Sequence, residues 1–346
     1  GIMDAFMDSK EIVSEEQWKQ WCSPVVPLLI SDKYCFSNSE HLKANIKVAN
    51  YSGAHFNNTQ VYCQIKQGDK TEYFIVLGGF IREGLDSIGN IDIDLSRFKE
   101  PTCLTMELGF LDDTGMTQKG IGYNSYHIWV YPNENHTEQL KKNLIIIHKM
   151  TDEIGQKLLK GAKVLLMPDS TDFVKDQVAG LFMTDYWNYR MFKTICESNK
   201  KAVSPGTLGI LTNPEHPIFN YFPTEMHTNW QWFPMIKESH PAILDNLGKE
   251  YRPIVQVIDN IERNHKLGLI FEFQIGKGKL LICMSDLEKT TKYPEGRAFY
   301  ESVLRYMHSD KFCPNTNLSD INALKTMLQQ KLENKNMDKL NNISQY

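Results

Sequence analysis

The sequence predicts a multidomain protein in which a β-rich domain precedes an α/β domain. The chain has 346 residues, which is enough for two domains of ordinary size. From about residue 25 to residue 132, apolar and polar side chains alternate as they do in half-buried strands. From about residue 138 to residue 313, short apolar runs alternate with amphipathic segments, a pattern typical of a sheet covered by helices.

The first domain is predicted from a series of strands with nothing helical between them. Between residues 42 and 50, Leu42 and Ile46 lie on one face of the predicted strand and Lys43 lies on the other. Similar runs follow at 61–66, 73–80, 88–95, 102–110 and 126–131. Turn-forming clusters rich in Gly, Asn and Asp separate these runs. Short strands at this spacing predict an immunoglobulin-like β-sandwich over residues 25–132.

The second domain, residues 138–313, is predicted to be α/β. The apolar run 144–147 lacks alternation, which indicates a strand covered on both faces. The next segment begins at Thr151, a residue suited to capping a helix, and ends at Gly161, which suits a left-handed helix end. A buried strand at 163–167 completes a strand–helix–strand unit. We expect further strands at 207–211, 254–258, 267–273 and 279–284, and a packing helix at 299–307.

The two ends of the chain are predicted to be accessory segments. Residues 1–24 form a lead-in that has neither the basic start nor the apolar stretch of a signal peptide, so this terminus assigns no compartment. Residues 314–346 are polar and rich in Asn and Lys. Within them, the spacing of Ile321, Leu324 and Leu328 predicts one amphipathic helix that is followed by a polar tail.

Charge and composition exclude several classes of partner and site. The chain has 38 Lys and Arg against 42 Asp and Glu, with no basic stripe, so we expect no nucleic-acid partner. Its longest apolar runs are far shorter than the roughly 20 residues of a membrane-spanning helix, so we expect no membrane span. The seven cysteines are scattered and include no CxxC pair, which disfavours a zinc ribbon and a disulfide framework.

No nucleophile and no cofactor site are predicted in the α/β domain. Hydrolase-like sheets place a catalytic Cys or Ser on a tight strand-to-helix turn between small residues. Cys196 lies between Ile195 and Glu197, and Cys283 lies in the middle of a predicted strand, so both are interpreted as structural thiols. The Gly-Lys-Gly motif at 276–278 lacks the spacing of a phosphate loop and is predicted to form a hairpin turn.

Two acidic motifs and two histidines are predicted to have no catalytic or metal-binding role. Glu134 follows an Asn, as the acid/base of many retaining glycosidases does, and Glu215 lies in an Asn-Pro-Glu-His motif. Glycoside hydrolysis needs two carboxylates about 5–9 Å apart across a pocket, so both residues are interpreted as solvated loop carboxylates. His216 and His227 form no HxH or HExxH pair, and we expect ordinary hydrogen bonds rather than a metal site.

A segment rich in aromatic residues and proline, residues 216–234 (the aromatic loop), is the most informative part of the domain. Its three prolines exclude a continuous helix. In one interpretation the loop is a carbohydrate surface, where a Trp stacks on a sugar and polar side chains bind its hydroxyl groups. In the favoured interpretation, the aromatic side chains anchor the loop to the sheet or to a neighbouring domain. The residues of this candidate carbohydrate or interdomain surface are Glu225, His227, Asn229, Trp230 and Trp232.

Several peptides of the chain carry a resemblance to a known family. They are residues 207–217, 222–232, 253–259, 266–272 and 276–283, together with the earlier 21–29. They resemble the region that follows the catalytic domain in glycoside hydrolase family 2 proteins of Bacteroidetes, over about residues 15–313. The resemblance implies that the α/β domain is flavodoxin-like, similar to class I amidotransferases and to a trimerisation domain of other β-galactosidases.

The resemblance implies a non-catalytic accessory region of a β-galactosidase-like enzyme of carbohydrate degradation. The family's catalytic glutamates lie in a (β/α)₈ barrel that these residues do not include, so none is assigned here. The implied roles are to brace the barrel, to shape substrate access or to support assembly. The implied partners are the barrel and sugar-binding domains of the parent chain, an oligosaccharide and a second copy of the chain.

The resemblance also implies a bacterial parent that is periplasmic or extracellular. Two alternatives stay open. One is an autonomous carbohydrate-binding module that uses the aromatic loop. The other is a small amidotransferase-like hydrolase.

Overall fold

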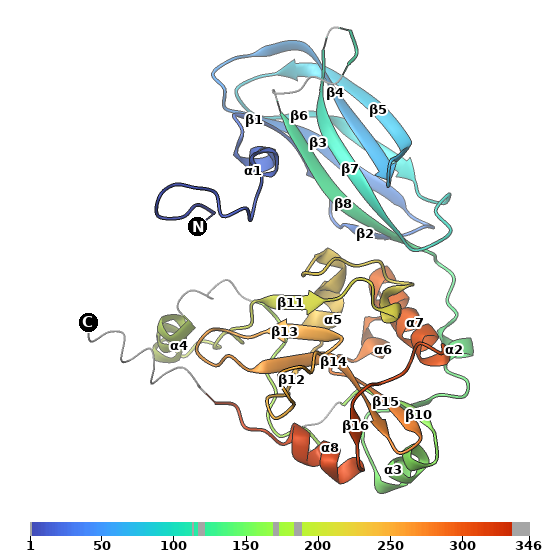
Figure 1. The fold of residues 1–346 in the computed structure, drawn as a ribbon. Helices are drawn as coiled ribbons and strands as arrows, with labels where there is room; N and C mark the ends of the chain where they lie inside the picture. Colours follow the sequence, from blue (N-terminus) through green and yellow to red (C-terminus); the bar gives the residue numbers. More distant parts are fainter. Residues whose placement is uncertain (1, 113, 117–121, 169–172, 183–188, 334–346) are drawn as a thin grey trace. The chain divides into compact units, whose positions relative to one another are not determined.

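The chain divides into two units, Gly1–Asn133 and Glu134–Tyr346, each with its own sheets (Figure 1). The computed structural model describes residues 2–112, 114–116, 122–168, 173–182 and 189–333. The polar tail predicted after residue 333 lies outside the described residues. Among the described residues, no helix has both the length and the apolar character needed to cross a membrane.

Unit 1 is built from two β-sheets, as predicted for the N-terminal part of the chain. A three-stranded sheet has the order β1-β3-β6, and a five-stranded sheet has the order β2-β8-β7-β4-β5. The strands are β1 (Val25–Ile30), β2 (Cys35–Ser37), β3 (His41–Asn50), β4 (Phe56–Gln67), β5 (Lys70–Ile81), β6 (Gly84–Asp94), β7 (Thr102–Leu111) and β8 (Tyr123–Tyr131). Their pairing is antiparallel except between β2 and β8.

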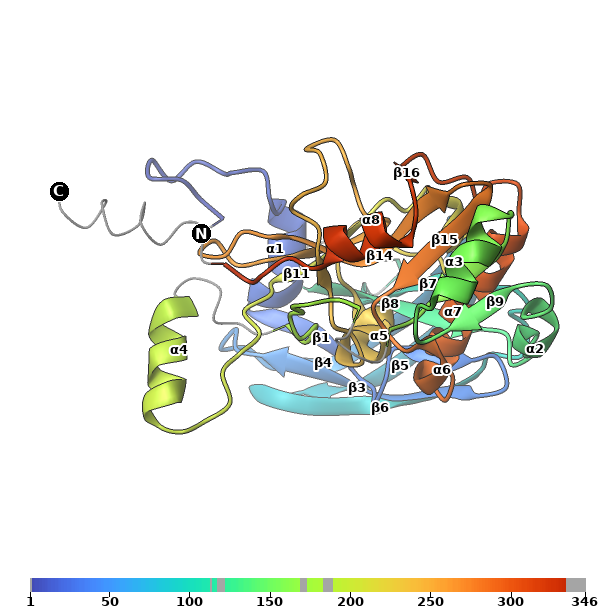
Figure 2. The ribbon, with the colours of Figure 1, turned by 90° about the horizontal axis from the view of Figure 1, so that it is seen from below.

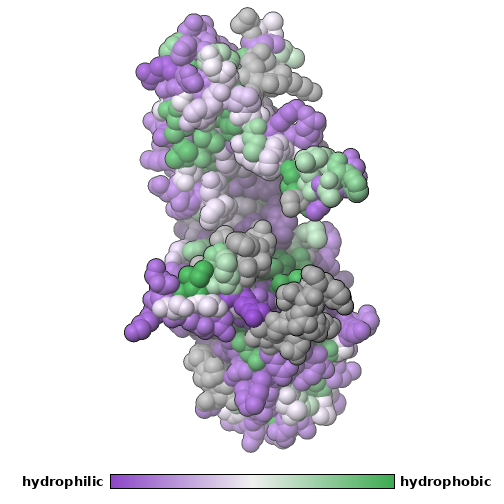
Figure 3. Space-filling model, turned by 90° about the vertical axis from the view of Figure 1, so that its left-hand side faces the viewer, coloured by the Kyte–Doolittle hydropathy of each residue, from purple (hydrophilic) through white to green (hydrophobic). Residues whose placement is uncertain are grey.

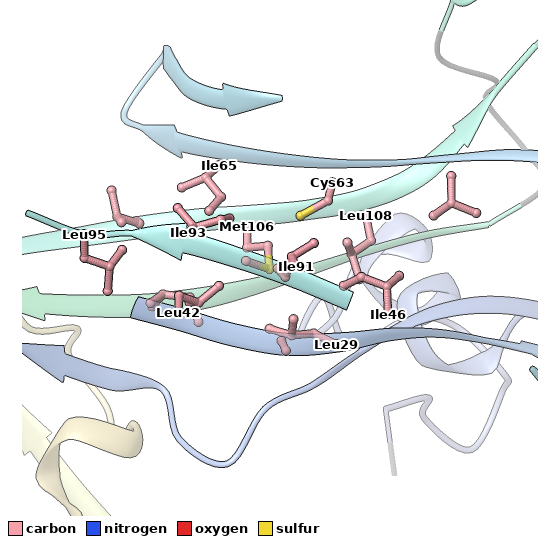
Figure 4. Packing of buried hydrophobic residues seen from close by; sticks show 14 of the residues in the cluster. Leu29, Leu42, Ile46, Cys63, Ile65, Ile91, Ile93, Leu95, Met106 and Leu108 are labelled. Atoms are coloured by element: carbon pink, nitrogen blue, oxygen red, sulfur yellow. The ribbon is translucent and has the colours of Figure 1, made fainter. Parts of the chain in front are cut away.

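The apolar faces of both sheets contribute to one hydrophobic core. The alternation predicted for β3 is confirmed, because Leu42 and Ile46 are buried whereas Lys43 is exposed. Figure 4 shows these two residues gathered with Met106 and Leu108 of β7 between the strands. Full burial of one such side chain stabilises a fold by about 1.5–3 kcal/mol, so this shared core holds the two sheets of unit 1 together.

A short helix, α1 (Glu15–Cys22), precedes the first strand of unit 1. The side chain of Ser14 accepts a hydrogen bond from the backbone N–H of Gln17 at 3.2 Å. In return, the Gln17 side chain accepts one from the backbone N–H of Ser14 at 2.9 Å. This reciprocal capping box fixes the start of the helix. The predicted lead-in therefore contains a capped helix.

Unit 2 is a mixed sheet with helices packed on it. Its main path runs β11-β13-β14-β15-β10-β9, and β12 and β16 pair with β14 outside that path. The strands are β9 (Ile145–Ile147), β10 (Lys163–Leu166), β11 (Gly209–Thr212), β12 (Ala242–Ile243), β13 (Val255–Ile258), β14 (Lys266–Ile275), β15 (Gly278–Cys283) and β16 (Asn317–Leu318). On the main path, pairing is parallel only among β9, β10 and β15, so the predicted α/β domain combines parallel and antiparallel pairing.

The helices of unit 2 lie between and after these strands. The α-helices are α2 (Thr137–Leu140), α3 (Asp152–Leu159), α4 (Tyr189–Ser198), α5 (Phe233–Lys237), α6 (Leu287–Thr290), α7 (Pro294–His308) and α8 (Ile321–Leu328). Two short 3₁₀ helices, η2 (Pro217–Phe219) and η3 (Trp230–Trp232), lie within the aromatic loop. In Figure 2, α3 and α7 lie at the same end of the unit as β15.

Local predictions for unit 2 are confirmed at two places. The strand–helix–strand unit is β9–α3–β10, in which Thr151 Oγ1 accepts a hydrogen bond from the N–H of Ile154 at 3.3 Å. Gly161 follows the helix with a φ of +113°. The hairpin between β14 and β15 is present as well, and Gly276 turns the chain there with a φ of +59°.

Helix α7 lies against the sheet of unit 2 and buries the apolar stripe that was predicted for it. Phe299, Val303 and Met307 are all fully buried. The ammonium group of Lys163 on β10 donates a hydrogen bond to the backbone carbonyl of Met307 at 2.7 Å, which ties the end of α7 to the sheet.

On the face drawn in Figure 3, hydrophilic side chains cover most of the described surface and apolar side chains form scattered groups. Scattered apolar residues are ordinary on protein surfaces and do not by themselves mark a site.

Candidate functional site

One edge of β14 is interrupted by a gap. Strand β13 pairs with β14 as far as Ile270, and β16 pairs with it again from Gln274. Between these two points, no described strand pairs with residues 271–273 on this edge. A register shift between Val255 and Gln256 marks the place where β13 leaves the edge. The backbone carbonyl of Glu272 instead accepts a hydrogen bond of 3.3 Å from the hydroxyl of Tyr251.

An open cavity of about 740 Å³, here called the groove, lies at this gap. Four segments line it: β11 with the loop after it, the loop before β13 with the start of that strand, Glu272 on β14, and the residues before β16. Its apolar side chains are those of Leu211, Leu247, Pro253 and Ile254. Its polar side chains are those of Thr212, Asn213, His216, Glu250, Tyr251, Arg252, Gln256, Glu272, Asn315 and Thr316. A few hydrogen-bonding groups set among apolar ones are typical of ligand sites.

Glu272 on β14 supplies a partly buried carboxyl group to the groove. Its Oε2 accepts a hydrogen bond of 2.8 Å from the hydroxyl of Tyr306 on α7. Burial raises the pKa of Glu272 to about 7, against the opposing effects of the Tyr306 hydrogen bond and of Lys279. A carboxyl group with a pKa near neutrality in a cavity is a candidate for function, because perturbed titration is common at functional sites.

His216 borders the groove and contacts the same tyrosine. It is the N-cap of η2, and its Nδ1 accepts a hydrogen bond of 3.3 Å from the backbone N–H of Ile218. The neutral ring therefore carries its proton on Nε2. Burial lowers the pKa of His216, which favours this neutral form. The ring lies edge-on to Tyr306 with 5.2 Å between centroids, so His216, Tyr306 and Glu272 form one continuous set of contacts.

The structure separates the two tryptophans of the aromatic loop. Trp232 is fully buried, and its indole N–H donates a hydrogen bond of 2.8 Å to Thr224 Oγ1. Its ring packs against Phe222 and Phe299, with centroids 5.2 and 5.0 Å away. Trp232 therefore has no exposed face on which a sugar could stack. It anchors the loop to α7 instead.

Trp230 is 62% exposed and lies beside a smaller cavity of about 330 Å³. Among the other predicted site residues, Asn229 also lines this cavity, and its Nδ2 donates a hydrogen bond of 3.0 Å to Glu225 Oε2. His227 is exposed, and its Nδ1 lies 3.1 Å from the backbone carbonyl oxygen of Thr228. The structure thus brings Glu225 and Asn229 together near Trp230 while Trp232 points into the core.

The cysteines and loop glutamates that were predicted to lack catalytic roles have ordinary surroundings for structural or solvated side chains. Burial raises the pKa of the Cys283 thiol to about 12, so it is protonated at neutral pH and is a poor nucleophile. Cys196 is partly buried on α4. Glu134 and Glu215 are exposed, as solvated loop carboxylates are. The described part of the chain holds no group of three His, Cys, Asp or Glu side chains arranged to bind a metal ion.

Sequence reasoning missed the residues at the centre of the groove. Glu272 lies between Phe271 and Phe273 in a strand predicted to be apolar. A lone carboxylate in such a run is a usable signal, because a buried charge must be paired or must have a shifted pKa. Tyr251 and Tyr306 carry no comparable signal, since the packing of a loop brings Tyr251 to the groove and the packing of a helix brings Tyr306 to Glu272.

In comparisons with known proteins, each unit matches a different family model over most of its length. Residues 145–329 match DUF8487, a domain of unknown function. Residues 40–132 match DUF8488, also a domain of unknown function. No curated protein matches the chain.

Several solved structures show distant similarity to part of the chain. The β-glucuronidase of Parabacteroides merdae is 14% identical over 41% of this chain and 21% of its own, with a TM-score of 0.23. The β-glucuronidase of Bacteroides uniformis is 11% identical over 42% of this chain and 20% of its own, with a TM-score of 0.22. The sporulation control protein Spo0M of Bacillus subtilis is 12% identical over 34% of this chain and 51% of its own, with a TM-score of 0.21. This chain thus spans about a fifth of the length of the two β-glucuronidases.

Proposed function

The chain belongs to the DUF8487 family of domains of unknown function, and we propose that it is a non-catalytic accessory region of a carbohydrate-degrading enzyme. In this proposal, unit 2 binds an oligosaccharide in the groove. The observation that carries the proposal is the groove itself, an open cavity of about 740 Å³ at the gap in the sheet edge.

The groove has the mixed polar and apolar lining that an oligosaccharide requires. Sugar hydroxyl groups need both donors and acceptors, and Asn213, Gln256 and Thr316 offer amide and hydroxyl groups from three different segments. The C–H faces of a sugar need apolar contacts, and Leu211 and Ile254 supply them. Because the cavity is open, the ends of a longer chain could extend into solvent.

The nature of the parent enzyme is the finer part of the proposal. The peptides that resemble glycoside hydrolase family 2 support a β-galactosidase-like parent with a separate catalytic barrel. In that setting, unit 1 is an immunoglobulin-like sandwich and unit 2 is a flavodoxin-like, class I amidotransferase-like domain. The region would then brace the barrel, shape substrate access or support assembly with a second copy, in a periplasmic or extracellular location.

The test is a glycan-array screen of the full chain, followed by calorimetric titration of each hit. We expect saturable binding that weakens about tenfold in Gln256→Ala, which removes one groove amide and leaves the backbone unchanged. The matched control is Asn220→Ala, which removes an exposed amide outside the groove and should leave the affinity unchanged. Folded protein that binds no glycan on the array would refute the proposal.

A second candidate surface is the cavity beside Trp230. The observation that favours it is the pairing of two exposed aromatic side chains, Trp230 and Phe233, at 62% and 51% exposure, with the Asn229–Glu225 hydrogen bond nearby. Exposed aromatic rings can stack on sugars. Binding lost in Trp230→Ala but kept in Gln256→Ala would place the ligand here and would make the chain a carbohydrate-binding module that uses its aromatic loop.

A further inference from the structure

The carboxyl group of Glu272 has no cationic partner in the described part of the chain. Its one described side-chain hydrogen bond is the one that Oε2 accepts from Tyr306 at 2.8 Å. Among the described residues, no Lys, Arg or His nitrogen lies within 4.0 Å of its carboxylate oxygens, and none donates a hydrogen bond to Oε1. A partly buried carboxylate without a cation is costly, which leaves a place for a charge that the ligand brings.

The nearby cations of the protein are already engaged elsewhere. Lys279 lies on the neighbouring strand β15, but its ammonium group donates a hydrogen bond of 2.6 Å to the backbone carbonyl of Phe312. Arg252 lines the groove, and its Nη1 donates hydrogen bonds to the backbone carbonyls of Lys249 and Tyr251 at 2.5 and 3.2 Å. Neither side chain forms an ion pair with Glu272.

The other titratable groups around Glu272 do not supply a positive charge at neutral pH. His216 is held neutral by its burial, and Tyr306 on α7 is a hydroxyl donor whose pKa is raised far above neutrality, mainly by burial and then by Glu272. Tyr251 contacts the backbone of Glu272. Glu250, in the loop before β13, adds a second acidic side chain to the lining. The ionisable side chains that line the groove are therefore two Glu, one engaged Arg, one neutral His and Tyr251, whose raised pKa keeps its hydroxyl protonated.

We infer that the groove takes an amine-bearing sugar whose ammonium group pairs with Glu272. This inference rests on the oligosaccharide binding proposed above and names the class of sugar. An ammonium group brings three donors, so it can bond the open Oε1 of Glu272 and neighbouring acceptors of the groove at once. Hydrogen bonds between an ammonium and a carboxylate are among the stronger ones in proteins.

Binding of the ammonium group is coupled to the loss of the carboxyl proton from Glu272. Free Glu272, with a pKa of about 7, is partly protonated at pH 7. An ammonium group that pairs with it favours the carboxylate, so the carboxyl proton passes to solvent when the ligand binds. A ligand amine that is already protonated keeps its own proton, whereas a neutral amine takes up the carboxyl proton, so net release to solvent is expected below the pKa of the sugar amine. Acidification should therefore weaken the binding of the amine-bearing ligand, because its ammonium must displace that proton.

The experiment is calorimetric titration of the full chain with two matched ligands. One is a glucosamine trimer with free amines, and the other is its N-acetylated counterpart. We expect the free-amine trimer to bind at least tenfold more tightly at pH 7 and to lose roughly tenfold or more between pH 7 and pH 5.5. The N-acetylated trimer should show no such loss. At pH 5.5, where the amines are protonated, titration in two buffers of different ionisation enthalpy should reveal proton release for the free-amine trimer alone.

Two variants complete the test. Glu272→Gln keeps a side chain that can bond Tyr306 but carries no charge, and it should bring both trimers to the same affinity. Glu153→Gln removes an exposed carboxylate on α3 and should leave the difference between the trimers unchanged. Equal affinities in the unmodified chain, without proton release, would overturn the inference and leave oligosaccharide binding intact. Binding of neither trimer nor any other glycan would overturn both.

Discussion

The hydroxyl of Tyr306 lies 2.8 Å from Oε2 of Glu272 and joins helix α7 to strand β14, whose Glu272 lines the groove. Both residues belong to regular elements whose neighbours are fully buried, including Phe273 on the strand and Met307 on the helix. Rigid elements hold functional groups more accurately than loops do. The groove therefore has a fixed carboxyl group in its lining, while loops supply much of the rest.

The first prediction concerns the pH dependence of stability. The folded pKa of Glu272 is raised to about 7, whereas the ordinary value is 4.5. The folded state therefore holds a proton that the unfolded state has lost, and the stability contribution of this group falls as pH rises from about 4.5 to 7. The fall is on the order of 3 kcal/mol at most, and solvent screening of the partly buried group lowers it.

In Glu272→Gln this fall is absent, since an amide does not titrate. Relative to the unmodified chain, the variant should gain stability at pH 8 compared with pH 5. Urea unfolding of both proteins at these two pH values measures the difference. A difference that stays constant between pH 5 and pH 8 would show that the carboxyl group titrates normally in the folded protein.

The second prediction separates the two tryptophans of the aromatic loop. Trp232→Ala should destabilise unit 2 by about 3–5 kcal/mol, because it leaves a cavity beside Phe222 and Phe299 and leaves Thr224 without its indole donor. Trp230→Ala removes an exposed ring and should change the free energy of unfolding by less than about 1 kcal/mol. Denaturant unfolding followed by circular dichroism distinguishes the two, and equal losses would contradict the assignment.

The third prediction uses a close contact in unit 1. A Cβ atom added at Gly109 of β7 would lie 2.7 Å from the ring of Tyr62 on the paired strand β4. Gly109→Ala should therefore displace the ring and cost about 1–3 kcal/mol of stability. Gly78→Ala on β5 is the matched control, since nothing lies within 4 Å of its added Cβ. The comparison is a thermal unfolding measurement on both variants.

The fourth prediction concerns a buried ion pair in unit 2. Asp259 Oδ1 accepts hydrogen bonds from Nε and Nη2 of Arg263 at 3.0 and 2.6 Å, and its Oδ2 accepts one from the backbone N–H of His265 at 3.1 Å. Asp259→Ala leaves the Arg263 charge buried without its partner, and the expected cost is about 3–5 kcal/mol.

The exposed pair between Glu153 and Lys157 provides the control for that prediction. Both side chains are about half exposed or more, at 75% and 49%. Removing this pair with Glu153→Gln should change stability by less than about 1 kcal/mol. Similar losses in Asp259→Ala and Glu153→Gln, measured by urea unfolding, would show that burial adds nothing to the Asp259–Arg263 pair.

Much of the fold could be predicted because burial on one face leaves a period of two in the sequence. The alternation around Leu42 and Ile46 specified β3, and six strands were predicted in this way. Strand β1 lacks such alternation because its residues are all apolar. It includes Pro27, which is tolerated because β1 is an edge strand. In unit 2, β14 is apolar on both faces, and that pattern is the same for parallel and antiparallel neighbours. The predicted hairpin already implied that β14 and β15 are antiparallel, but the antiparallel pairing of β14 with β13 and its parallel pairing with β16 could not be predicted.

The candidate site was predicted less well, for a physical reason. Trp230 and Trp232 are two positions apart and equally aromatic, and only the short helix η3 decides that one is exposed and the other is buried. The groove depends on the gap between β13 and β16, whose bounding strands are 62 positions apart at Val255 and Asn317. No local pattern records such a distant arrangement. Only Glu272 could have been recognised from the sequence, because it is a charged residue within an apolar strand.

The gap in the edge of β14 also separates the backbone pairing of this edge from the side chain of Glu272 in the groove. The ladder of backbone hydrogen bonds on this edge is made on either side of residues 271–273, by β13 and by β16. Position 272 can therefore be exchanged for another polar side chain while those ladders remain. Under the proposed function, engineering of this one position would retune ligand preference on an unchanged scaffold.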